Sequence, residues 1–118
     1  VDLRDSTSGS GRALGLELID VGERYAFEVD GGNITAIQAV TSNNQTSTTN
    51  FQPALQRYWW IGGRDDCAVW EVSSDGVKWE EVQRSCGVTL GELTVVLYVR
   101  AEADTDTAEA AFGGVNVL

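Results

Sequence analysis

The chain has 118 residues, and eight basic against eighteen acidic side chains give it a formal net charge of -10. Its length fits one domain, and a composition of 42% hydrophobic and 22% charged residues is that of a globular protein. The acidity argues against nucleic acid or an anionic lipid surface as the main partner. Histidine is absent, which excludes Ser–His and Cys–His nucleophile pairs and ordinary zinc sites within this sequence. No apolar run approaches the ~20 residues that cross a bilayer, so no membrane insertion is expected.

Apolar and polar residues alternate with a period of two along most of the chain, and no stretch keeps the spacing of an amphipathic helix. This pattern predicts an all-β protein. In chain order, the expected strands are residues 14–20, 25–30, 34–40, 46–51, 57–62, 67–73, 77–83, 93–101 and 110–118. Nine short strands at this spacing indicate a single domain over residues 1–118, an antiparallel β-sandwich of jelly-roll type.

Turn residues separate the expected strands. The run DGGN at residues 30–33 holds residues that tolerate positive φ and predicts a tight hairpin. The run SSDG at residues 73–76 predicts a second tight hairpin. Residues 41–50 are rich in Ser, Thr, Asn and Gln, and they fit a loop or a polar edge strand equally well.

The two cysteines, Cys67 and Cys86, flank this second hairpin. In a regular hairpin centred on residues 75–76, opposite positions have numbers that sum to about 151 to 153, and the numbers of these two sum to 153. The register therefore brings them close enough for a disulfide, with Cα atoms ~5.5 Å apart. Two alternatives stay open: a pair of buried free thiols, or a bridge, which would indicate an oxidising setting such as the extracellular space or a virion surface.

The spacing of the acidic residues indicates neither a catalytic site nor a metal site. A glycosidase needs two carboxylates on one face of a cleft, and each candidate pair is out of phase on its strand or straddles a turn. These pairs are Glu17 with Asp20, Glu80 with Glu81, and Glu71 with Asp75. In residues 104–106 (DTD), carboxylates at alternate positions offer the oxygen ligands that calcium prefers. A solvated acidic loop is nevertheless the favoured interpretation. No cofactor or metal is therefore expected.

Aromatic residues are the strongest functional signal. In a strand, Trp59 and Trp60 point to opposite faces, so one can fill the core while the other lies on an outer surface. Exposed indoles form platforms for sugar rings, and they also anchor protein interfaces. We expect one of the pair to face the surface. The candidate ligand-binding residues are Tyr58, Trp59, Trp60, Asn43, Asn44 and Gln45.

Four runs carry a family resemblance through their order and spacing. They are YAFEVDGG at residues 25–32, RYWWI at 57–61, WEVSSDGVKW at 70–79 and AFGGVNV at 111–117. Over residues 14–118 the chain resembles the concanavalin A-like lectin/glucanase sandwiches. More narrowly, it resembles modules appended to secreted actinobacterial proteins and to phage tail or minor tail proteins.

The chain differs from the family that it resembles in two respects. Such modules are normally much longer, which implies missing opening strands, supplied upstream or replaced by a neighbouring subunit that covers open edges. Separately, methionine is absent and the sequence begins at Val1, so we expect the chain to be a processed or excised piece, or the ordered part of a longer one. Relatives often close on Ala-Phe-Asp-Asn-Val, whose aspartate serves a structural calcium. Gly113 and Gly114 stand in its place here, and nothing matches the catalytic Glu-x-Asp-x-Glu strand of the glucanase branch.

These observations predict a non-catalytic sandwich in a larger extracellular or virion assembly. The first interpretation is glycan recognition through a sheet face and its loops. The second is a structural or interaction module of a phage tail or adhesin that binds a protein surface and no sugar. The third is a glycoside hydrolase. The expected partners are a glycan or protein surface, together with upstream domains or neighbouring subunits.

Overall fold

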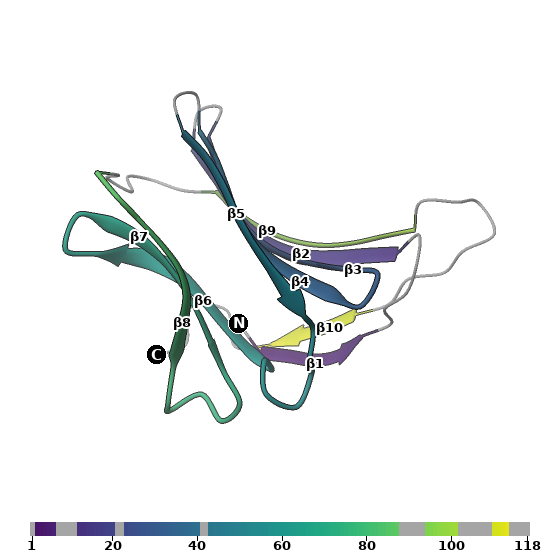
Figure 1. The fold of residues 1–118 in the computed structure, drawn as a ribbon. Coiled ribbons are helices and arrows are strands. Elements are labelled where there is room, and N and C mark those ends of the chain that lie inside the picture. The colour runs from purple at the N-terminus through teal and green to yellow at the C-terminus, as the bar shows by residue number, and fades with distance from the viewer. Residues whose placement is uncertain are drawn as a thin grey trace.

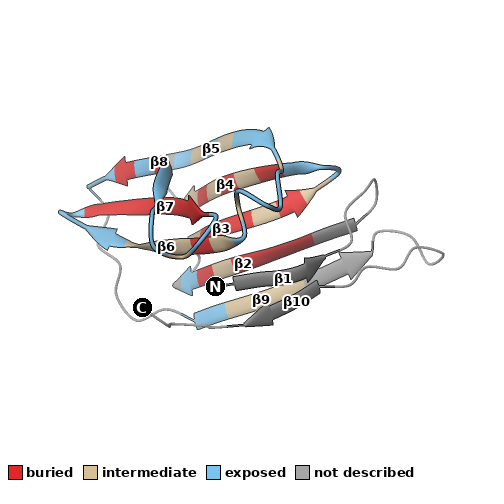
Figure 2. Ribbon diagram, turned by 90° about the horizontal axis from the view of Figure 1, so that it is seen from below, coloured by how far each residue is buried: buried red, intermediate tan, exposed pale blue. Residues whose placement is uncertain are grey.

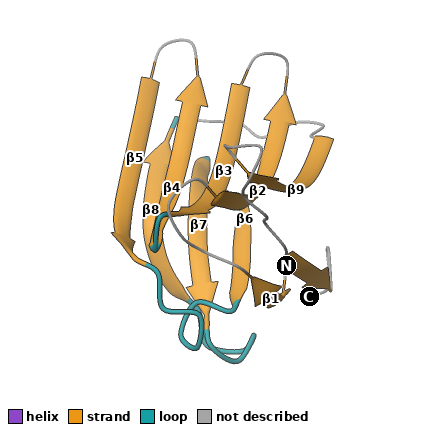
Figure 3. Cartoon of the chain, turned by 90° about the vertical axis from the view of Figure 1, so that its right-hand side faces the viewer, coloured by secondary structure: helices purple, strands orange, loops and turns teal. Residues whose placement is uncertain are grey.

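The computed structural model of the chain describes residues 2–6, 12–20, 23–40, 43–87, 94–101 and 110–113. Within these ranges every regular element is a β-strand (Figure 3), as the period-two alternation predicts. The strands are β1 (Asp2–Ser6), β2 (Arg12–Asp20), β3 (Glu23–Asp30), β4 (Asn33–Val40), β5 (Asn43–Asn50), β6 (Tyr58–Arg64), β7 (Cys67–Ser73), β8 (Glu80–Cys86), β9 (Thr94–Ala101) and β10 (Ala110–Gly113). The described residues include no helix that could span a membrane.

Two antiparallel sheets form the layers of a β-sandwich (Figure 1). The first sheet has the order β10-β1-β6-β7-β8, and the second has the order β5-β4-β3-β2-β9. Among the described residues a single pair, Asp2 opposite Tyr58, joins β1 to β6, so the first sheet consists of a β6–β8 meander and a β1–β10 ribbon. Strands near the start of the chain pair with strands near its end, β1 with β10 and β2 with β9, as in a jelly roll. The prediction of an antiparallel all-β sandwich is confirmed.

The nine predicted strands correspond to β2 through β10, and β1 was not predicted. Leu3 is the only apolar residue in β1, so the segment has no alternation to detect; its pairing with β10 defines it. Residues 43–50 form β5, so the edge-strand interpretation of this polar region is correct. The predicted extension of the last strand over residues 114–118 lies outside the described residues, as does the acidic run at 104–106.

The turn between β3 and β4 is the tight hairpin that its sequence predicts. Asp30 lies opposite Asn33, and the two residues between them, Gly31 and Gly32, have φ angles of 59° and 83°. Both angles lie in the left-handed region that glycine adopts without steric cost. This turn fixes the β3–β4 register.

The turn between β7 and β8 is longer than predicted. The Ser73 hydroxyl accepts hydrogen bonds from the backbone N–H groups of Asp75 and Gly76, at 3.2 and 2.9 Å. The Asp75 carboxylate accepts from those of Val77 and Lys78, at 2.8 and 2.9 Å. These bonds stabilise a wider loop, and β8 therefore starts three residues later than expected.

The core lies between β2, β3 and β4 of one sheet and β6 and β7 of the other (Figure 2). Trp70 on β7 is fully buried, and its Nε1 donates to the Ala26 carbonyl of β3 at 3.0 Å, which ties the two layers together. The buried cluster comprises Leu14, Leu16, Leu18, Tyr25, Phe27, Val29, Ile34, Ala36, Trp59, Ala68, Trp70 and Val72. Alternate residues of each strand supply it, as a half-buried sheet requires.

A disulfide joins Cys67 on β7 to Cys86 on β8. The two residues lie directly opposite each other in the register, as the sum of their numbers predicts. Between Trp70 and Glu71 the register shifts by one residue, because β8 carries a bulge. The bridge closes the end of the hairpin farthest from its turn.

Candidate functional site

Trp59 and Trp60 point to opposite faces of β6. Trp59 is fully buried, its ring centroid lies 5.8 Å from that of Phe27, and its Nε1 donates to the Gln56 carbonyl at 2.8 Å. Trp60 is partly exposed on the outer face of the first sheet. Trp60 is therefore accessible at the surface, whereas Trp59 belongs to the core.

Glycine beneath Trp60 and arginine beside it hold the indole on this outer face. A Cβ at Gly62 would overlap the six-membered ring of Trp60, so only glycine leaves room for the indole here. The Arg64 guanidinium carbon lies 4.4 Å from the centroid of the Trp60 ring, which is within cation–π range. Residues 60, 62 and 64 alternate along β6, so all three lie on the same face.

The Arg64 guanidinium also pairs with a buried carboxylate on the next strand. Its Nη1 lies 2.5 Å from Glu71 Oε1, and the Glu71 side chain is only 8% exposed while that of Arg64 is 50% exposed. Glu71 lies directly opposite Trp60 in the β6–β7 register. The indole, the guanidinium and the carboxylate therefore form one contiguous cluster.

A second ion pair continues this cluster onto β8. Arg84 Nη2 lies 2.7 Å from Glu81 Oε1, and the bulge in β8 brings these residues, three apart, onto one face. Hydrogen bonds from Arg84 lower the pKa of the Glu81 carboxyl, which Arg64 lowers further. Glu81 lies opposite Glu71. We call Trp60, Arg64, Glu71, Glu81 and Arg84 the outer-face cluster.

Tyr58 lies at the end of the same face, beside the β7–β8 loop. The Arg57 guanidinium carbon lies 5.2 Å from its ring centroid, and a Cβ at Gly76 would be 3.6 Å from its ring. The ring is partly exposed. Tyr58 and Trp60 flank Trp59 in the strand, so both point to the face opposite Trp59. Tyr58 therefore extends the aromatic surface toward the loops.

The predicted polar ligands on β5 lie on the other sheet. Asn44 is exposed there, and the side chain of Asn43 lies outside the described residues. Gln45 Nε2 donates to the Arg84 carbonyl at 3.3 Å, so this side chain points toward β8. The structure therefore gathers Tyr58 and Trp60 on one face and does not bring Asn44 to them.

Comparison with protein-family models, curated proteins and solved structures gives no match.

A second polar cluster lies on the outer face of the other sheet. The Tyr98 hydroxyl donates to the Glu28 carboxylate, and its ring occupies the space that a Cβ at Gly15 would need. Arg24 pairs with Glu17 and donates from Nη2 to the Tyr98 hydroxyl at 3.3 Å. Burial raises the pKa of Tyr98, and its hydrogen bond to Glu28 raises it further. The four side chains of this cluster therefore pair with one another.

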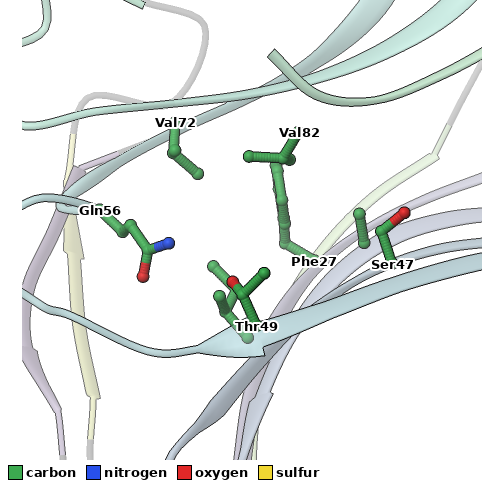
Figure 4. A pocket seen from close by; sticks show the side chains of 8 residues that line it. Phe27, Ser47, Thr49, Gln56, Val72 and Val82 are labelled. Carbon is green, nitrogen blue, oxygen red and sulfur yellow. The ribbon is translucent and has the colours of Figure 1, made fainter. Parts of the chain in front are cut away.

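A small cavity opens between the layers at the β5 and β8 edges (Figure 4). Phe27, Val72 and Val82 supply its apolar wall, and Ser47 and Thr49 supply hydroxyl groups. Its volume of about 30 Å³ has room for water but not for a sugar ring. Among the described residues, no group of three or more Asp, Glu, Cys or His side chains could hold a metal ion. The outer-face cluster is therefore the better candidate for a ligand site.

Sequence analysis missed Arg64, Glu71, Glu81 and Arg84 as members of the site. The register that pairs Cys67 with Cys86 would place Glu71 opposite Val82, and only the bulge in β8 brings Glu81 there instead, so the sequence carried no signal for this pairing. The arginines could not be predicted, because their positions depend on the β8 bulge and on the indole that Arg64 covers.

Proposed function

We propose that the chain is a non-catalytic glycan-binding module, similar to the concanavalin A-like lectin sandwiches, and that the outer-face cluster binds the sugar. The observation that carries the proposal is the position of Trp60, a partly exposed indole on a sheet face with Arg64 against it. An indole presents an apolar face to the C–H groups of a sugar, while guanidinium and carboxylate groups bond to its hydroxyls.

The cluster is organised before any ligand arrives. Arg64 contacts both the Trp60 ring and the Glu71 carboxylate, so its long side chain has already lost much of its rotational freedom. Binding then costs less conformational entropy than it would with a free arginine. This preorganisation supports a recognition role.

A neutral glycan fits the charges of the site. Two arginines and two glutamates cancel within the cluster, and the whole chain carries -10. An anionic polysaccharide would be repelled over a distance of about a Debye length. We therefore propose a neutral hexose polymer, such as a cell-envelope polysaccharide, as the ligand class.

The carboxylates support binding rather than hydrolysis. A glycosidase needs one carboxyl group whose pKa is raised so that it can act as a general acid. In this cluster each glutamate is paired with an arginine, and the pKa of Glu81 is lowered. The disulfide supports an oxidising location, which agrees with an extracellular or virion protein.

The exposed loops favour a second candidate, an interaction module of a phage tail or adhesin. Leu55, Val77 and Trp79 are 57%, 78% and 38% exposed, and they lie in the β5–β6 and β7–β8 loops. These two loops lie at the same end of the molecule (Figure 3). Exposed apolar residues on neighbouring loops are typical of protein contact surfaces.

Calorimetric titration with neutral oligosaccharides tests the first proposal. We expect binding to cellohexaose, mannohexaose or chitohexaose, a loss of affinity of about tenfold or more in Trp60→Ala, and little change in Trp79→Ala, the matched control on the loop. The far-ultraviolet spectrum of each variant checks that it is folded. Failure of all three sugars to bind, or equal binding by both variants, would reject the proposal and favour the interaction module.

A further inference from the structure

An open edge runs along β5, at one side of the second sheet. β5 pairs with β4 over its full length, and none of the described strands pairs with its other edge, although β8 of the opposite layer comes close to β5, where Gln45 Nε2 donates to the Arg84 carbonyl. Just beyond these pairs, the Phe51 N–H donates to the Gly32 carbonyl at 2.9 Å, so residues 32 and 51 form a hydrogen-bonded pair in the same register. Hydrogen-bonded and non-hydrogen-bonded pairs alternate along an antiparallel ladder. The residues that direct their backbone N–H and C=O groups away from β4 are therefore Asn44, Thr46, Thr48 and Asn50.

This edge has none of the features that protect other sheet edges. Open edges are usually blocked by charges, proline, bulges or short strands. Among the described edge strands, β8 has a bulge and three charged residues, β9 contains Arg100, and β10 has four residues. β5 has the sequence NNQTSTTN, without charge or proline, and its eight pairs with β4 run without a register shift.

A long charge-free stretch surrounds this edge. Residues 31–56 contain no Asp, Glu, Lys or Arg, although 22% of the chain is charged. Two copies of a chain with a net charge of -10 repel each other, and this stretch lets them meet without like charges at the contact. An oppositely charged partner would gain nothing from such an edge. The absence of charge therefore favours a second copy of this chain as the occupant.

The sequence of β5 is also nearly symmetrical about Ser47. If two copies run antiparallel about a two-fold axis at this residue, Thr46 lies opposite Thr48 and Asn44 opposite Asn50. These are the residues with outward backbone groups, so the pairing would form about eight hydrogen bonds. Within one chain, the hydroxyl oxygens of Thr35 and Thr48 already lie 3.0 Å apart across β4 and β5. The pairing would continue this threonine row into the partner.

We propose that β5 joins two copies of this chain edge to edge, so that their five-stranded sheets form one continuous sheet. The contact consists mainly of backbone hydrogen bonds and buries little apolar surface. The dimer is therefore weak and concentration-dependent. It lies on the sheet opposite the outer-face cluster, so it does not depend on sugar binding.

Sedimentation velocity of the whole chain, from about 1 to 500 µM, tests the proposal. We expect a shift from the mass of one chain to that of two. The variant T46K/T48K should weaken association about tenfold or more, because the introduced charges face like charges across the axis. T46E/T48E should do the same, and an equimolar mixture of the two variants should restore the dimer. The matched control, N33K/T35K, adds the same charge to β4, one strand away from the edge, and should associate as the unchanged chain does.

Thr48→Pro gives a second, independent variant. The Thr48 N–H points away from β4, so proline removes an edge donor without breaking the β4–β5 ladder. It should abolish association while the far-ultraviolet spectrum is retained. If the unchanged chain stays monomeric over this concentration range, the proposal is wrong, and the edge would instead pair with a strand from another protein. Association that withstands both lysines and proline, or a mixture that does not restore the dimer, also overturns it.

Discussion

Trp70→Phe tests the packing of the two layers. Trp70 is fully buried, it lies 6.1 Å from the Tyr25 ring, and its Nε1 bonds to the Ala26 carbonyl of the opposite sheet. Phenylalanine removes this hydrogen bond, worth about 1 kcal/mol, and leaves a cavity where the second ring was, worth about 1–2 kcal/mol. We therefore expect the free energy of unfolding to fall by about 2–3 kcal/mol, and the melting temperature by about 10 °C.

Urea unfolding followed by far-ultraviolet circular dichroism measures this effect without relying on tryptophan emission. Trp79→Phe is the matched control, because the same chemical change occurs at a side chain that is 38% exposed. It should alter the free energy of unfolding by less than about 0.5 kcal/mol. Equal stability of the two variants would refute the inference that Trp70 ties the layers together.

Three further predictions concern the disulfide, the β7–β8 loop and one glycine. Replacing Cys67 and Cys86 by alanine should cost about 3 kcal/mol, because the bridge spans 19 residues of sequence; urea unfolding that matches the oxidised chain would contradict this. Hydrogen bonds from the Lys78 and Val77 backbone lower the pKa of Asp75 below its ordinary 3.8. Its contribution to stability should therefore be complete above pH 3.8 and lost as the pH falls through the lower, folded-state value. The amide proton shifts of its two donors should titrate below pH 3.8 in the native chain and not in Asp75→Asn; an inflection at or above 3.8 would argue against the loop geometry. Gly15→Ala should destabilise the fold by about 1–3 kcal/mol, since the added methyl would lie 2.6 Å from a backbone oxygen and from the Tyr98 ring; a higher melting temperature would contradict it.

The sandwich was predictable because its strands repeat a simple physical pattern. Leu14, Leu16 and Leu18 alternate with other residues along β2, and a half-buried strand requires that period. The glycine pair at the β3–β4 turn likewise determines a local backbone conformation that sequence reveals directly. Two features could not be predicted, since tertiary contacts define them. β1 is recognisable only by its pairing with β10, and the β7–β8 loop widens because Ser73 bonds to the backbone.

The site was predictable only in part. The alternation of Trp59 and Trp60 required one indole to face outward, but which of them does so depends on how β6 packs against Phe27. The ion pairs of the outer-face cluster join residues on three strands, so they depend on sheet order and on a bulge. Sequence spacing within one strand carries no information about such contacts, which is why the polar residues of β5 were grouped with the aromatic residues.

The most direct test of the account is nuclear magnetic resonance of the indole N–H groups of the chain's four tryptophans. Adding a neutral oligosaccharide should shift the Trp60 signal strongly, while those of Trp59 and Trp70, buried and hydrogen-bonded to backbone carbonyls, should stay in place. A sugar that binds and leaves the Trp60 signal unmoved would contradict the claim that the outer-face cluster is the ligand site.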